Sequence, residues 1–147
     1  MKAFSFRLDS ILNYRRYREK CAQRDLANAR NEQKSRKTAI EELARERLRI
    51  AQKCSHEGSQ GIDVARYHLY RSFLAKLNQD LEHAHLSLRE GEKNIKAKTE
   101  LLREKSVGKK TLTMLKDVQL ESHMQRSERE TQREMDEMVI IRRGGRA

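Results

Sequence analysis

The sequence contains no proline and no tryptophan, and aromatic residues make up only 5% of its 147 residues. Because 37% of the residues are charged and large apolar side chains are few, little is left for the core of a layered globular fold. High charge also suits a disordered chain. The charges here alternate in sign, however, and the apolar residues recur at regular spacing, which favours long helices.

Long hydrophobic runs are missing as well. No segment approaches the roughly 18 consecutive apolar residues of a membrane-spanning helix. The N-terminal stretch MKAFSFRLDS also lacks the continuous apolar core of a signal peptide. We therefore expect a cytoplasmic protein.

Only two cysteines are present, Cys21 and Cys54, and their separation excludes a CxxC metal or redox site. On one helix they would lie about 50 Å apart, which is too far for a disulfide within the chain. We expect two reduced thiols at positions where helices pack.

The residue types that usually build catalytic or metal sites are scattered. His83 and His85 are two residues apart, so on a helix they point to different sides, and neither has a histidine four residues away to complete a zinc pair. The stretch SVGKKT is not a phosphate-binding loop, because Arg103 and Lys110 replace the required glycine and hydroxyl residue. We expect no enzymatic activity, no cofactor and no metal ion.

The sequence does contain two seams at the alternating four- and three-residue spacing of supercoiled helices. The first seam follows Leu8, Leu12, Arg15, Glu19, Ala22, Leu26, Ala29, Gln33, Arg36, Ile40, Leu43, Arg47, Ile50 and Cys54, and its middle is poorly apolar. The second follows Tyr67, Tyr70, Leu74, Leu77, Leu81, Ala84, Leu88, Gly91, Ile95, Lys98 and Leu102. This pattern predicts an all-α protein.

The residues between the seams indicate a reversal of the chain. Gly58, Ser59 and Gly61 tolerate the left-handed backbone of a helix end, and Asp63 can cap the helix that follows. We predict a long antiparallel two-helix coiled coil, an α-helical hairpin, in a single domain. Its expected parts are helix one at about 7–55, a turn at 56–62, helix two at 63–142 and a flexible tail at 143–147.

The two predicted helices differ in length, so the second should overhang from about residue 112. Its apolar residues there would have no partner in the chain, and a lone helix is marginal in water without a packed apolar face. Met135 and Met138 in this overhang are candidate partner-binding residues.

The net charge of +11 makes nucleic acid a candidate partner, because clustered basic residues gain affinity by releasing counterions from phosphates. The charges are mixed, however, with 15 basic and 8 acidic residues up to Glu57 and 18 and 14 after it. RRYREK at 15–20 and RRGGR at 142–146 are the strongest basic stretches, and anionic lipid or an acidic protein fits them as well as DNA. A basic nucleic-acid-binding protein and a generic coiled-coil scaffold therefore remain alternatives.

Three segments share their order and spacing with one known family. They are FSFRLDSILNYRRYREKCAQRDLANA at 4–29, GIDVARYHLYRSFLAKL at 61–77 and REMDEMVIIRR at 133–143. Together they resemble the flagellar export protein FliJ family over nearly the whole chain. The resemblance implies a non-enzymatic coiled-coil component of the bacterial flagellar type III protein export apparatus.

The resemblance also implies partners. The joined ends of the two helices would enter the export ATPase ring, and the hairpin would contact the cytoplasmic domain of the membrane export gate protein. Export chaperones would be escorted, and no nucleic acid is expected. The chain would be held peripherally at the inner face of the cell membrane, at the flagellar base.

Four residues carry the implied gate contact. Matching the family motif to this sequence places the gate contact on Phe73 and Leu77, with Leu43 and Ile50 as weaker candidates. Phe73 lies outside the second seam and should be exposed, which is costly unless a partner covers it, whereas Leu77 lies within the seam and should be buried.

Overall fold

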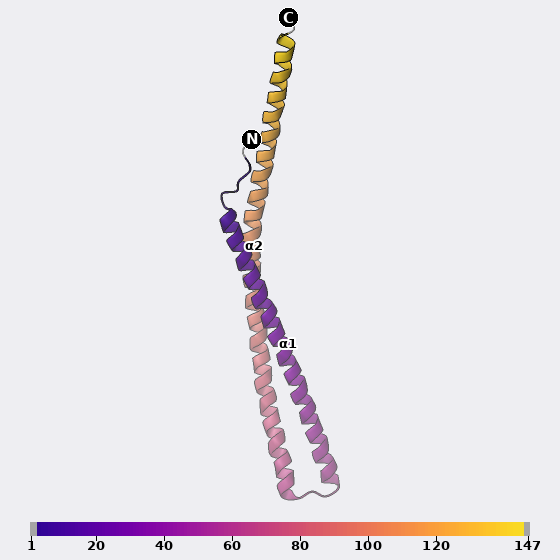
Figure 1. Cartoon of the computed structure of the whole chain (residues 1–147). Coiled ribbons are helices and arrows are strands. Elements are labelled where there is room, and N and C mark those ends of the chain that lie inside the picture. Colours follow the sequence, from indigo (N-terminus) through magenta and orange to yellow (C-terminus); the bar gives the residue numbers. More distant parts are fainter. Residues whose placement is uncertain (1–2, 146–147) are drawn as a thin grey trace. The chain divides into compact units, whose positions relative to one another are not determined.

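The computed structural model describes residues 3–145, and two long helices account for nearly all of them (Figure 1). Helix α1 runs over Asp9–Ser59 and helix α2 over Val64–Gly144. Residues 3–145 contain no strand. The two helices pack against each other, which confirms the predicted all-α fold with a longer second helix.

The composition explains why the helices are long. Proline is absent, and most positions hold residues with good helix propensity such as Leu, Ala, Glu, Lys, Arg and Gln. Asp9 lies in the first turn of α1, and Arg142 and Arg143 lie in the last turn of α2. Both placements are favourable, because an acidic side chain complements a helix N-terminus and basic side chains complement a C-terminus.

The chain divides into two compact units, which are described separately. The hairpin unit comprises residues 22–102 and holds the end of α1, the turn and the start of α2. The terminal unit holds the N-terminal segment, the start of α1 and the remainder of α2, and is described for residues 3–21 and 103–145.

The turn of the hairpin unit follows Ser59. Gly61 has a φ of +88°, a left-handed conformation that glycine adopts without strain. The Ser59 hydroxyl donates to the His56 carbonyl at 2.7 Å, and the Gln60 N–H donates to the Glu57 carbonyl at 3.2 Å. These bonds satisfy carbonyl groups that a helix end leaves open, so α1 continues through Ser59 instead of ending near residue 55.

The start of α2 is tied to the end of α1. Asp63 precedes the first helical residue, and its carbonyl accepts a hydrogen bond from the Tyr67 N–H at 2.9 Å. The Arg66 guanidinium contacts both oxygens of the Glu57 carboxylate, at 3.1 and 3.2 Å. Loss of solvent around Tyr70, and then its hydrogen bond with Glu57, raise the pKa of the Tyr70 hydroxyl.

The seam of the hairpin unit contains a polar contact between the arms. The Gln33 side-chain amide is buried and donates to the Leu88 carbonyl of α2 at 2.9 Å. A Cβ added to Gly91 would overlap the Gln33 and Arg36 side chains. Glycine therefore stands at this seam position because the side chains of α1 approach the backbone of α2 closely.

The core of the terminal unit is small and apolar. Phe6, Leu12 and Leu112 form a buried cluster, and Phe4 and Leu8 pack against it. The segment before α1 is thus held by hydrophobic contacts with both helices.

Polar contacts also join α1 and α2 in the terminal unit. They are the ion pairs Asp9–Lys116 at 2.8 Å and Glu19–Lys109 at 2.6 Å, and a hydrogen bond from the Arg15 guanidinium to the Gly108 carbonyl at 2.7 Å. The partners of the two ion pairs occur in opposite order along the two helices, so the helices are antiparallel here as well. α2 passes through Gly108 without interruption.

The contacts of the N-terminal segment with α2 extend beyond the predicted start of the overhang near residue 112. The Phe4 and His123 rings lie 5.6 Å apart between centroids, and Phe4 and Ser5 line a groove together with Arg126. Further along α2, five large apolar side chains are exposed, namely Met135, Met138, Val139, Ile140 and Ile141. Of the expected tail at 143–147, residues 143 and 144 belong to α2, and residues 146–147 lie outside the described part of the chain.

Candidate functional site

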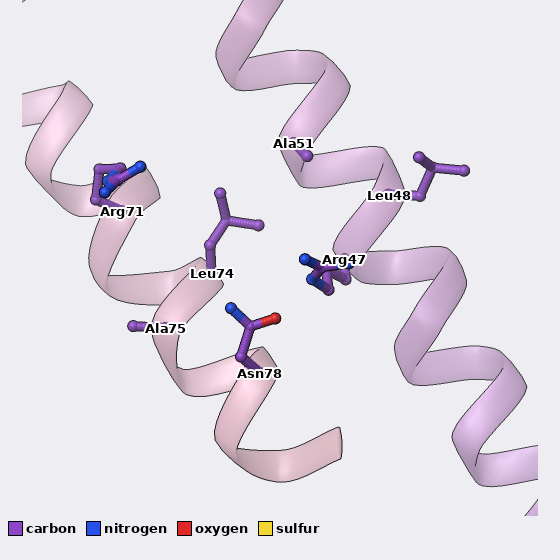
Figure 2. A pocket seen from close by; sticks show the side chains of 7 residues that line it. All are labelled: Arg47, Leu48, Ala51, Arg71, Leu74, Ala75 and Asn78. Carbon is purple, nitrogen blue, oxygen red and sulfur yellow. The ribbon is translucent and has the colours of Figure 1, made fainter. Parts of the chain in front are cut away.

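A groove opens between the two arms of the hairpin unit. It has a volume of about 330 Å³ and is lined by Arg47, Leu48 and Ala51 of α1 and by Arg71, Leu74, Ala75 and Asn78 of α2. Figure 2 shows Arg47 from α1 and Leu74 and Asn78 from α2 directed into the space between the helices. Leu48 lies on the side of α1 that faces away from α2 (Figure 2). The groove therefore combines an apolar floor with two guanidinium groups and one amide.

The structure separates the four predicted gate-contact residues by burial. Phe73, which directly precedes the groove residue Leu74, is 40% exposed, as its position outside the seam predicts. Leu77 and Ile50 are only 5% and 8% exposed, and Leu43 is partly buried. Phe73 is thus the member of this set that offers a side chain to a partner while the two arms stay packed.

The two predicted methionines lie in the terminal unit. Met135 and Met138 are 59% and 63% exposed on α2. They are three positions apart, so they share one face of the helix. Their side chains are flexible and polarisable, which suits adaptable apolar contacts.

The groove has the chemistry of a binding surface. It is lined by aliphatic groups, two arginines and an asparagine, none of which is a usual nucleophile or general base at neutral pH.

Within residues 3–145, no group of three His, Cys, Asp or Glu side chains is placed to hold a metal ion. Over the same residues, neither helix is long and apolar enough to cross a membrane. Cys21 and Cys54 are both free and partly buried, and of the two only Cys54 lies at a position of the predicted seam.

Sequence reasoning missed the groove itself. It placed Arg47 in a seam and did not single out Leu48, Arg71 or Asn78. One signal was available, because Leu48 is an apolar residue that lies outside the four- and three-residue register. The arginines carried no such signal, since charged residues are frequent throughout the chain.

Comparison with known proteins identifies one family. The family model of the flagellar FliJ protein matches residues 4–146, and no curated protein and no solved structure matches the chain. The match covers nearly the whole chain and agrees with the two packed helices. The chain therefore belongs to the flagellar FliJ family, whose members are components of the flagellar protein export apparatus.

Proposed function

We propose that this chain couples the export ATPase ring to the cytoplasmic domain of the membrane export gate, and that it also escorts export chaperones. The observation that carries the proposal is the exposed Phe73 beside the groove of the hairpin unit. Aromatic side chains, phenylalanine included, are enriched at protein interfaces, and a neighbouring groove gives the partner a surface to fill.

The gate contact centres on Phe73 in this proposal. Leu77 and Ile50 act indirectly, because they are buried between the arms and hold the two helices that form the groove. Arg47 and Arg71 add charge at the groove and favour a partner segment that carries carboxylates.

The ATPase contact belongs to the terminal unit. Met135, Met138 and the three apolar residues at 139–141 are exposed on α2 beyond the last contacts of the N-terminal segment. Covering this surface on insertion into a ring would remove apolar area from water, which contributes roughly 25 cal/mol per Å² before the costs of association.

The gate contact is tested by binding of the purified chain to the immobilised cytoplasmic domain of the gate protein. Phe73→Ala should weaken binding about tenfold or more, which is the loss expected for an interface anchor. Leu86→Ala is the matched control, because Leu86 is also an exposed apolar residue of α2 but lies on another helix face. Parent-like binding of Phe73→Ala would exclude Phe73 as the contact.

The ATPase contact needs a separate measurement. The double variant Met135→Ser with Met138→Ser should lose binding to the ATPase ring and keep binding to the gate domain. Met114→Ser is the control, since Met114 is similarly exposed on the same helix. Equal loss of ATPase binding in the control would show that the overhang is not the specific contact.

Coupling itself requires both contacts at once. Gate domain on beads should retain the ATPase only when the chain is added, and neither the Phe73 variant nor the methionine variant should support this retention. If the ATPase is retained equally without the chain, the coupling role is excluded. The escort role is tested in the same format, with an export chaperone in place of the ATPase.

A further inference from the structure

The terminal unit carries a second groove, distinct from the one in the hairpin unit. It has a volume of about 600 Å³ and lies between the start of α1 and the middle of α2. Its lining consists of Ile11, Tyr14, Arg15 and Arg18 on α1 and of Glu104, Lys105, Val107 and Gly108 on α2.

The floor of this groove is apolar and accessible. Ile11 is 46% exposed, Tyr14 is 57% exposed and Val107 is 56% exposed. Each is a large side chain that the packing of the two helices leaves uncovered. Three such residues around one concave surface form a patch that gains stability when a partner covers it.

The basic rim of the groove is ordered by contacts within the unit. The Arg18 guanidinium lies 5.8 Å from the centre of the Tyr14 ring and donates to the Tyr14 hydroxyl at 3.2 Å. The Arg15 guanidinium donates to the Gly108 carbonyl at 2.7 Å. This bond fixes the position of the guanidinium, and its other N–H groups remain available to donate to a partner. Because the arginines are already positioned, less side-chain entropy is lost when an anion binds.

The surroundings of the groove are strongly basic. Residues 11–20 and 103–110 together contain eight basic and two acidic residues. One of the two acids, Glu19, is buried and paired with Lys109 at 2.6 Å, so it contributes little negative field at the surface. A local excess of this kind attracts negatively charged partners and accelerates their association at low salt.

From these observations we propose that the groove of the terminal unit docks an acidic amphipathic segment of a partner protein. Carboxylates of that segment pair with Arg15, Arg18 and Lys105, and its apolar side chains cover Ile11 and Val107. Nucleic acid fits less well, because a phosphate backbone offers no apolar group to cover Ile11 and Val107. The proposal does not depend on the coupling function, because it uses none of the residues assigned to the gate or ATPase contacts.

The test measures fluorescence anisotropy of a labelled peptide of about 18 residues, long enough to form a helix and made of Glu, Ala and Leu, with the leucines on one face. The full-length chain should bind this probe at about 50 mM salt, and binding should weaken as the salt concentration rises. Arg18→Glu and Tyr14→Ala should each reduce the affinity about fivefold or more. Both residues are exposed, and an unchanged circular dichroism spectrum would verify that the variants fold.

Matched controls separate a built site from general attraction. Lys53→Glu makes the same change in net charge at an exposed position of α1 in the other unit, and should alter probe binding less than about twofold. A peptide with serine in place of leucine should bind more weakly than the probe. No probe binding, equal loss with Lys53→Glu, or equal binding of the serine peptide would each overturn the proposal.

Two other occupants give distinguishable results. A single-stranded DNA of equal charge that binds more tightly than the peptide, and is equally sensitive to Arg18→Glu, would assign the groove to nucleic acid. Self-association of the chain that Arg18→Glu abolishes in sedimentation velocity would assign it to a second copy. Either result overturns the proposal.

Discussion

Glu19 and Lys109 form an ion pair whose contribution to stability can be predicted from its burial. The Glu19 carboxylate lies 2.6 Å from the Lys109 ammonium, and the Glu19 and Lys109 side chains are 10% and 30% exposed. Exposed pairs contribute about 0–1 kcal/mol, and breaking a fully buried pair costs about 3–5 kcal/mol. A partly buried pair falls between these limits, so Glu19→Ala should lower the free energy of unfolding by about 2 kcal/mol.

The assay is thermal unfolding followed by circular dichroism at 222 nm. For a chain of this size, about 2 kcal/mol corresponds to a decrease in Tm of about 4–8 °C. A double-mutant cycle with Lys109→Ala then isolates the pair, and the double variant should lose about 1 kcal/mol less than the two single losses together. Replacing both residues with leucine should be neutral or stabilising, because the desolvation cost of the two charges disappears.

Glu46 and Arg49 supply the control for this prediction. They form an ion pair at the same 2.6 Å distance, but within α1, and the Glu46 and Arg49 side chains are more exposed, at 38% and 60%. Glu46→Ala should therefore leave Tm unchanged within the error of the measurement. The reasoning is refuted if Glu46→Ala and Glu19→Ala lower Tm equally, because distance and not burial would then set the contribution.

Three further predictions address pH, the turn and the overhang. The hydrogen bonds of Asp9 and Glu19 with their lysine partners lower the pKa of each carboxyl below its ordinary value, 3.8 for Asp and 4.5 for Glu. Because protonation of these carboxylates then favours the unfolded chain, Tm should fall as the pH drops below about 4.5. A constant Tm down to pH 3 would contradict this prediction. Gly61→Ala should lower the free energy of unfolding by about 1 kcal/mol, because φ is positive there. Gly58→Ala, in open space within α1, should raise the free energy of unfolding by up to about 1 kcal/mol. Urea titration measures both changes, and two changes of the same sign would contradict this account of the turn. Deleting residues 128–147 should leave Tm within about 2 °C of the parent, since residues 128–145 are almost all exposed and add little packed surface. A fall of more than about 5 °C would show that this part of α2 packs.

The spacing of apolar residues predicted the packed faces of both helices well. Every position of the two predicted seams is at least partly buried except Arg47 and Tyr67. Tyr67 lies in the first turn of α2, beside the chain reversal, where fewer residues of α1 are available to cover it. At Arg47 the neighbouring Glu46 is the more buried residue, as expected when a helix of 3.6 residues per turn drifts from a 3.5-residue repeat.

Contacts between distant residues could not be predicted in the same way. The seam pattern identifies Glu19 and Arg15 as inward-facing, but their partners Lys109 and Gly108 depend on the axial alignment of the two helices. The N-terminal segment has no helical periodicity, so its packing through Phe6 onto Leu112 was not foreseen. Both grooves depend on side-chain size and direction at the sides of the seam, which the pattern of buried positions does not encode.

Two side chains of α1 bond to main-chain carbonyls of α2, one in each unit: Gln33 to Leu88 and Arg15 to Gly108. An apolar seam with a seven-residue repeat tolerates sliding by one repeat, because leucine then replaces leucine. In the hairpin unit such sliding is opposed at Gly91, because a slip of one repeat would bring Gln33 against the side chain of Ala84 or Lys98 in place of the gap at Gly91. The hairpin unit can therefore resist an axial pull along its helices, a mechanical property that apolar packing alone would not provide.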